Sequence, residues 1–301
     1  MTLTNRVALE LGGGHAVYWY GVMVASGFLL AMLVMQWLAP RFRVPRVRIS
    51  DIVVAAMVGG MLGARALYVL SNWDAYRVAP HRIFMIWEGG LVFYGGLIGA
   101  ALAVVLLGRW LRLDLGGVAD LTAIALPLGQ ALGRVGCFLN GCCFGPPAAS
   151  GPRVTYLMPP FEQVWQTQHE QGWINPENVQ QFLGPNGNPP HHCLPVLPVQ
   201  LYLGAMDLVV FAALLALGLA WRARRGGQLL ALYLVLCPAG RFVLEFWRGD
   251  YPARPGGLTP AQWAAVLLVP LGVVLFFWRR RAAPAPAPAS AVAAKASPGK
   301  T

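Results

Sequence analysis

Long apolar stretches alternate along the chain with short connections that are rich in arginine, glycine and proline. A helix needs about 20 mostly apolar residues to cross a membrane, because each residue adds about 1.5 Å along its axis. Seven stretches are long enough, and they cover approximately 16–39, 52–73, 91–108, 115–136, 198–221, 228–247 and 258–278. The pattern therefore predicts an all-α polytopic membrane protein with seven transmembrane helices.

Composition supports lipid as the main solvent of this chain. Of the 301 residues, 57% are hydrophobic and only 12% are charged, whereas soluble domains contain about 25% charged residues. The net charge of +11 could instead indicate a nucleic-acid partner. The positions of the basic residues relative to the apolar stretches decide between these interpretations.

The basic residues gather on one side of the predicted membrane. If the first helix enters from outside, the inner connections and the C-terminal end contain 14 of the 23 Lys and Arg residues, and the outer connections contain six. This excess predicts an outer N-terminus and a cytoplasmic C-terminus, so no nucleic-acid partner is expected. A transmembrane domain should cover 1–281 and include an outer loop at 146–197. The Ala/Pro-rich tail at 282–301 should be disordered.

Polar residues inside the predicted spans indicate a common site. An arginine within a span costs about 2.5–3.5 kcal/mol on insertion, so it requires a partner. Counting residues from the span ends places five side chains at a similar depth in the outer half of the membrane; they are Tyr20, Arg65, Tyr94, Arg134 and Arg241.

The arginines allow two interpretations. In one, each arginine reaches the interface or pairs with an acid, as Glu245 could pair with Arg241 four residues before it. In the other, the arginines bind an anion, because few acids lie at this depth and the guanidinium fork suits phosphate. Three arginines at one level favour an anionic lipid head group as the ligand.

The segment GRVGCFLNGCCFG at 133–145 resembles the GRxGNFxNGExxG signature of the prolipoprotein diacylglyceryl transferase family. Five further blocks are similar to motifs of that family and follow in the same order; they are YWYG (18–21), GARALY (63–68), WEGGLVFYGGLIG (87–99), PVQLY (198–202) and GRFVLEFWRGD (240–250). The resemblance covers approximately residues 15–280.

The resemblance implies an enzyme of the bacterial inner membrane that transfers the diacylglyceryl group of phosphatidylglycerol to the lipobox cysteine of a prolipoprotein. A thioether forms and glycerol phosphate leaves. The implied partners are phosphatidylglycerol, prolipoprotein signal peptides with a lipobox cysteine and membrane lipids, and no cofactor is expected. The arginines suit this chemistry, because the departing phosphate gains negative charge in the transition state.

Matching positions assign the site residues that the resemblance implies. The catalytic positions are Arg134, Arg241, Tyr94 and Glu245, and the substrate-binding positions are Tyr20, Arg65, Asn140, Gly145 and Arg248. Tyr94 stands where the family pattern has histidine, and a phenol with a pKa near 10 is a far weaker base at neutral pH. The resemblance therefore does not identify the general base.

The cysteines also depart from the family pattern, with Cys137 in place of asparagine and Cys142 in place of glutamate. A metal site would draw on Cys137, Cys142, Cys143, His191, His192 and Cys193. Adjacent cysteines lack the C-x₂-C spacing of structural zinc sites, so no metal site is predicted. A disulfide from Cys193 to Cys142 or Cys143 is preferred over a metal. Apolar packing of small thiols is the default interpretation, and Cys237 is expected in the core.

Two other classes of function remain as alternatives. An anion or lipid transporter could use the same arginines as its binding site, although such transporters usually show internal repeats and midplane sites. A membrane thiol-redox protein could instead be built on the cysteines. The sequence shows no internal repeat and places the arginines off-centre, which favours the transferase.

Overall fold

A computed structural model of the chain describes residues 1–12, 15–86, 89–158, 160–175, 192–221, 225–250 and 255–281. Its helices are α1 (Trp19–Leu38), α2 (Ile49–Ser71), α3 (Trp73–Tyr76), α4 (Phe93–Trp110), α5 (Leu115–Asn140), α6 (Glu162–Glu170), α7 (Val199–Ala220), α8 (Gln228–Leu244) and α9 (Pro260–Arg281). Its strands are β1 (Thr2–Leu3), β2 (Val7–Gly12), β3 (His15–Tyr18) and β4 (Thr155–Tyr156).

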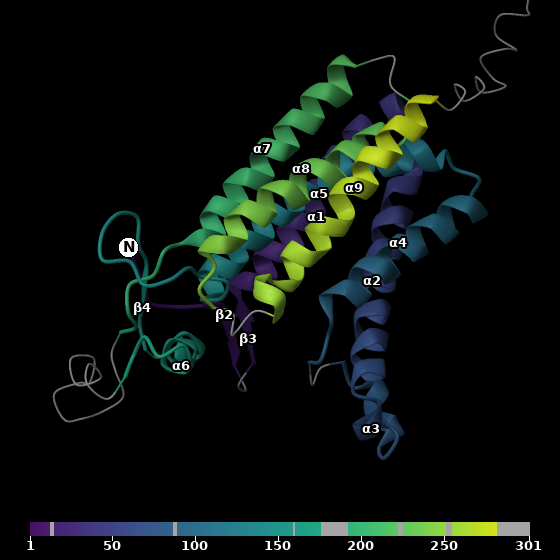
Figure 1. Cartoon of the computed structure of the whole chain (residues 1–301). Coiled ribbons are helices and arrows are strands. Elements are labelled where there is room, and N and C mark those ends of the chain that lie inside the picture. The colour runs from purple at the N-terminus through teal and green to yellow at the C-terminus, as the bar shows by residue number, and fades with distance from the viewer. Residues whose placement is uncertain are drawn as a thin grey trace, which may run out of the picture.

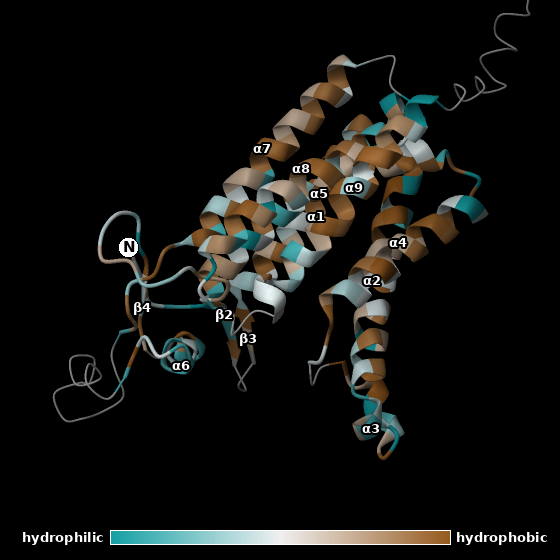
Figure 2. Ribbon diagram, in the orientation of Figure 1, coloured by the Kyte–Doolittle hydropathy of each residue, from teal (hydrophilic) through white to brown (hydrophobic). Residues whose placement is uncertain are grey.

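Among the described residues, seven helices are long and apolar enough to cross a membrane, which confirms the predicted fold class. With their flanking turns, the candidate spans are Trp19–Phe42, Arg46–Ser71, Phe93–Trp110, Leu115–Asn140, Val199–Ala220, Gln228–Trp247 and Pro260–Arg281. Apolar residues predominate along these helices (Figure 2), and many, such as Leu62 and Leu267, are exposed. A large exposed apolar surface is typical of a protein that faces lipid. The predicted disordered tail at 282–301 lies outside the described residues.

The long helices form two groups (Figure 1). In the larger group α5 packs between α1 and α7, and α9 packs against α8. The other group is the pair of α2 and α4, which contact mainly each other and diverge from the main bundle. Glycines allow the close approach within this pair, because a Cβ added at Gly63 would overlap the carbonyl oxygen of Gly95. Packing through small residues is typical of membrane helices.

A small cap covers one end of the main bundle (Figure 1). In it β1 pairs in parallel with β4, β2 pairs antiparallel with β3, and α6 packs beside them. Tyr156 and Phe161 are fully buried in the cap, with ring centroids 5.0 Å apart. The hydroxyl of Tyr156 donates to the carbonyl of Phe138 at 3.0 Å. The cap therefore holds the end of α5, where the signature motif lies.

Candidate functional site

The sequence Asn-Gly-Cys-Cys ends α5 and folds the chain back on the helix. Gly141 has a φ of 70°, in the left-handed region that glycine adopts readily after a helix. Its N–H donates to the carbonyl of Phe138 at 3.3 Å, and the N–H of Cys142 donates to the carbonyl of Cys137 at 3.1 Å. These two bonds make a Schellman motif. The motif brings Cys142 back beside Cys137.

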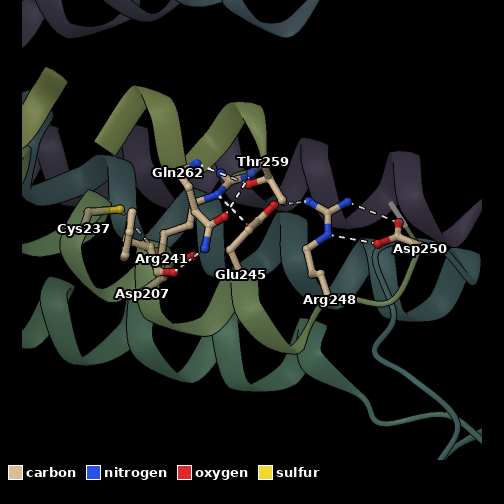
Figure 3. A network of polar contacts seen from close by, with 9 residues as sticks. Asp207, Cys237, Arg241, Glu245, Arg248, Asp250, Thr259 and Gln262 are labelled. Carbon is tan, nitrogen blue, oxygen red and sulfur yellow. Dashed lines mark hydrogen bonds and ion pairs between the residues drawn. The ribbon is translucent and has the colours of Figure 1, made fainter. Parts of the chain in front are cut away.

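The end of α8 carries a buried chain of charges (Figure 3). Glu245 is fully buried, and its Oε1 accepts a hydrogen bond from Nη1 of Arg248 at 2.9 Å. Its Oε2 lies 3.7 Å from Nε of Arg241, one helical turn earlier. Arg248 also donates from Nε and Nη2 to the two carboxylate oxygens of Asp250, at 3.0 and 3.1 Å. One carboxylate thus orients two arginines, and a second acid neutralises Arg248.

Hydrogen bonds join three distant motif blocks. The N–H of Cys143, after α5, donates to Oδ2 of Asp250, after α8, at 3.0 Å. Gln200, in the first turn of α7, donates from Nε2 to the carbonyl of Cys142 at 2.7 Å. The tertiary structure therefore places residues 140–145, the signature loop, directly against the charged network of α8.

Arg134 lies on α5 beside this network. A Cβ added at Gly204 of α7 would lie 3.4 Å from the Cβ of Arg134, so the two helices approach closely there. Within the described part of the chain, its guanidinium makes no hydrogen bond or ion pair, although Arg241 and Asp207 lie within electrostatic range. Nε of Arg241 is buried and has no hydrogen-bond partner among the described residues. The two guanidinium groups thus retain donors for an anion.

Arg65 lies in the α2–α4 pair and uses its donors within the protein. Its guanidinium makes five hydrogen bonds of 2.5–3.3 Å to the carbonyls of Arg82, Ile83, Met85, Gly89 and Gly90. It also lies over the rings of Tyr68 and Tyr76. A guanidinium has five N–H groups, so none is left for a lipid phosphate in this arrangement. The sequence predicted one site with three arginines. In the structure Arg134 and Arg241 lie near each other, whereas Arg65 lies in the other group of helices.

The two predicted tyrosines also lie in different groups of helices. Tyr20 lies on α1 against Gly136 of α5, where it is exposed and within electrostatic range of Arg134. Tyr94 lies in the first turn of α4, and its ring centroid is 5.7 Å from that of Phe93. The structure therefore brings Tyr20 to the surroundings of Arg134, whereas Tyr94 lies on a helix of the other group.

Asn140 and Gly145 lie at the two ends of the signature loop. Nδ2 of Asn140 donates to Sγ of Cys142 at 3.9 Å, and its carbonyl accepts from Gln163 at 2.7 Å. Gly145 is buried, and a Cβ there would lie 2.7 Å from a methyl group of Val199. Gly145 therefore permits close backbone packing, whereas Asn140 faces the cysteines.

All five cysteines are free thiols, so Cys193 does not form the disulfide that was preferred over a metal site. Cys193 is fully buried among apolar residues of the cap, and this burial raises the pKa of its thiol to about 12. Cys237 is buried in the core of the main bundle, as predicted. Apolar packing, the default interpretation, thus describes these two cysteines.

The other three cysteines form a cluster that their spacing did not predict. The Sγ atoms of Cys137, Cys142 and Cys143 all lie within 4.8 Å of one another, and the three residues are half-buried. Hydrogen bonds from the thiols of Cys137 and Cys142, and then the charges of Arg248 and Arg134, lower the pKa of the Cys143 thiol. The Asn-Gly pair at the end of α5 is the signal that could have revealed the cluster, because glycine directly after a helix favours a fold-back of the chain.

Comparison with known proteins identifies a family that covers nearly the whole chain. The family model for prolipoprotein diacylglyceryl transferase matches residues 6–278. The phosphatidylglycerol--prolipoprotein diacylglyceryl transferase of Rhodospirillum rubrum is 33% identical over 292 residues, which cover 93% of this chain and 94% of the relative. The enzymes of that name from Geobacillus kaustophilus and Halalkalibacterium halodurans are 33% and 31% identical, and the matches cover 92% of this chain and 93% and 87% of the relatives. The chain therefore belongs to the prolipoprotein diacylglyceryl transferase family.

Proposed function

We propose that this chain transfers the diacylglyceryl group of phosphatidylglycerol to the lipobox cysteine of prolipoproteins in a bacterial inner membrane. The names of its relatives support both substrates. Within the chain, the observation that carries the proposal is the adjacent pair Arg134 and Arg241, which retains donors for an anion. Guanidinium groups bind phosphate through paired, charge-assisted hydrogen bonds.

In the proposed reaction, negative charge develops on the leaving phosphate, beside Arg134 and Arg241. The thiolate of the acceptor attacks the glyceryl carbon that carries the phosphate. A carbon–sulfur bond forms while the carbon–oxygen bond to phosphate breaks, and glycerol phosphate leaves with the electron pair. The leaving phosphate becomes more negative, so Arg134 and Arg241 stabilise the transition state more than the bound lipid.

Glu245 and Arg248 act as positioning residues in this proposal. Glu245 is fully buried and faces both Arg241 and Arg248, which suits it to hold arginines rather than to collect a proton from a substrate. Arg248 is held in turn by Asp250. Because the arginines are already in position before the lipid binds, less free energy is needed to reorganise them as the phosphate gains charge.

The other predicted site residues take separate roles. Tyr20 and Asn140 face the region between Arg134 and the cysteines and contact the substrates there. Arg65 organises the connection before α4, which carries Tyr94 in its first turn. Gly145 lets the signature loop pack tightly against the residues that precede and begin α7.

The orientation that we propose puts the site in the outer half of the membrane. The cap and the ends of α5 and α8 lie toward one end of the main bundle (Figure 1). The basic last turn of α9 contains Arg279, Arg280 and Arg281 and lies toward the other end. An excess of basic residues favours the cytoplasmic side, so the N-terminus and the cap face outward.

Complementation of a bacterium depleted of its own transferase tests this function in cells. The chain should restore growth and the lipid modification of a reporter prolipoprotein. In vitro, purified chain with phosphatidylglycerol vesicles should convert a lipobox peptide to its thioether and release glycerol phosphate. Movement of lipid or phosphate across vesicles without any thioether would instead identify a transporter.

A further inference from the structure

The proposed transfer requires a thiolate, but a free cysteine has a pKa of about 8.5 and is mostly protonated at neutral pH. Tyr94 is a weak base, and Glu245 is fully buried with its carboxylate oxygens toward two arginines. Meanwhile three half-buried thiols lie beside Arg134 and Arg248 with no role in the reaction as described. Their arrangement offers a way to generate the thiolate.

We propose that Cys137, Cys142 and Cys143 bind a zinc ion whose fourth coordination position takes the lipobox thiol. This inference rests on the proposed transferase function for the identity of that thiol. Three protein ligands with one open position are typical of catalytic zinc sites, whereas structural sites use four protein ligands. The cluster of three sulfurs matches the open kind.

The backbone holds the three sulfurs close to the required geometry. Zinc–sulfur bonds of about 2.3 Å in a tetrahedron separate the sulfurs by about 3.8 Å. The observed limit of 4.8 Å is close enough for small side-chain rotations to complete the site. Cys137 and Cys142 are joined by the Schellman motif. Cys143 is held by Asp250 in a left-handed conformation with a φ of 60°, which is strained for a residue other than glycine.

The surroundings suit a reactive metal site better than apolar packing. The three cysteines are half-buried and remain approachable, unlike the fully buried Cys193. The amide of Asn140 donates to Sγ of Cys142, as residues outside the ligand set often do in metal sites. Zinc with three thiolates carries one net negative charge, and a fourth thiolate makes it two. Arg134, which makes no ion pair among the described residues, is the nearby cation that can balance part of this charge.

The chemistry follows from coordination of the acceptor thiol. A thiol that binds zinc loses its proton, which passes to water at the outer face. The zinc-bound thiolate then attacks the glyceryl carbon of phosphatidylglycerol. The carbon–oxygen bond breaks, glycerol phosphate leaves toward Arg134 and Arg241, and the neutral thioether has little affinity for zinc and dissociates. Zinc is not oxidised or reduced, so the step needs no further reagent.

Metal analysis of the full chain, purified under reducing conditions without chelator, tests the site directly. We expect about one zinc per chain. The C142S/C143S double variant should lose at least about nine-tenths of it, whereas Cys237→Ala, which removes a thiol from the core, should keep it. Thermal unfolding of the variants shows whether they are folded. The proposal is overturned if the wild-type chain retains less than about 0.1 zinc ion per chain after zinc is added. It is also overturned if two of the three cysteines form a disulfide that persists under reducing conditions.

Cobalt substitution tests the open position independently of turnover. The thiolate-to-cobalt absorption of the loaded chain should change when a lipobox peptide is added, and the same peptide with serine in place of its cysteine should leave it unchanged. An identical response to both peptides overturns the substrate role of the site.

Activity separates this inference from the proposed function. Removal of the metal should lower thioether formation at least about tenfold, and zinc should restore it. Full turnover by metal-free chain overturns the inference but supports the transferase. Zinc-loaded chain that binds the peptide but never forms thioether supports the site and contradicts the transferase.

Discussion

Glu245 and Arg248 share a hydrogen bond of 2.9 Å at the end of α8, where their side chains are 0% and 8% exposed. The same carboxylate lies 3.7 Å from Arg241. A buried acid between two arginines fixes their positions, but its second oxygen has no hydrogen bond among the described residues. Glu245 therefore makes a short hydrogen bond to Arg248 and only a longer ion pair to Arg241, the arginine that we assign to the lipid phosphate.

Glu245→Gln should lower turnover about 10- to 100-fold, or about 1.4–2.7 kcal/mol of barrier, because the arginines lose the charge that positions them. Glu245→Asp keeps the charge and should recover part of the activity. The pH profile of turnover should keep its shape in Glu245→Gln, which distinguishes a positioning residue from a general base. Loss of the acidic limb, where activity falls as the essential base is protonated, would show that Glu245 takes the proton.

Arg134→Ala and Arg241→Ala should each reduce thioether formation by roughly 10²–10³-fold, because each removes a charged donor from the developing phosphate. Lysine at either position should restore little, since a point charge cannot reproduce the guanidinium fork. Arg77→Ala removes an exposed arginine that pairs with Asp74 at the end of α3, outside the main bundle, and serves as the control. Wild-type turnover in either alanine variant would contradict the phosphate site.

Arg65→Met should act mainly on stability. The substitution leaves five carbonyls of the connection before α4 without their donor. Each unsatisfied buried polar group costs about 1–3 kcal/mol, although water will satisfy some of them. Thermal unfolding in detergent should shift down clearly relative to Arg77→Met. Unchanged stability together with a raised KM for phosphatidylglycerol would restore Arg65 to the lipid site.

Tyr94→Phe should reduce activity only mildly. A phenol with an ordinary pKa near 10 is protonated at neutral pH and suits hydrogen bonding to a lipid oxygen better than proton transfer. Tyr94→His, which introduces the residue of the family pattern, should be tolerated. Turnover of the two variants across pH provides the measurement. An inactive Tyr94→Phe beside a nearly normal Glu245→Gln would assign the acid–base role to Tyr94.

Reporter fusions should read the proposed orientation directly. Fusions after Arg46, Arg112 and Arg225 should report a cytoplasmic location, and fusions after Arg77 and Asn175 should report an external one, following the basic residues. An external signal at Arg225 would move the site to the cytoplasmic half of the membrane and exclude secreted prolipoproteins as its direct acceptors.

The sequence alone determined the seven membrane helices, and it predicted the two arginines that we assign to the lipid phosphate. Apolar runs of about 20 residues have few alternatives to a membrane helix, because lipid leaves no other way to satisfy the backbone. The resemblance to the family motifs then predicted Arg134 and Arg241 as catalytic positions. The strands of the cap escaped prediction, since they are only two to six residues long and depend on distant partners such as β1 with β4.

Only the tertiary structure decided what each polar residue contacts. Counting along helices placed Arg65 at the depth of Arg134 and Arg241, but depth says nothing about which face or which group of helices a side chain occupies. The packing of α2 against α4 placed the guanidinium of Arg65 among the backbone carbonyls of the connection before α4. In the same way, linear spacing argued against a metal site, whereas the fold-back at Gly141 gathered three sulfurs. Contacts between residues distant in sequence depend on how the helices pack, and local patterns do not encode that packing.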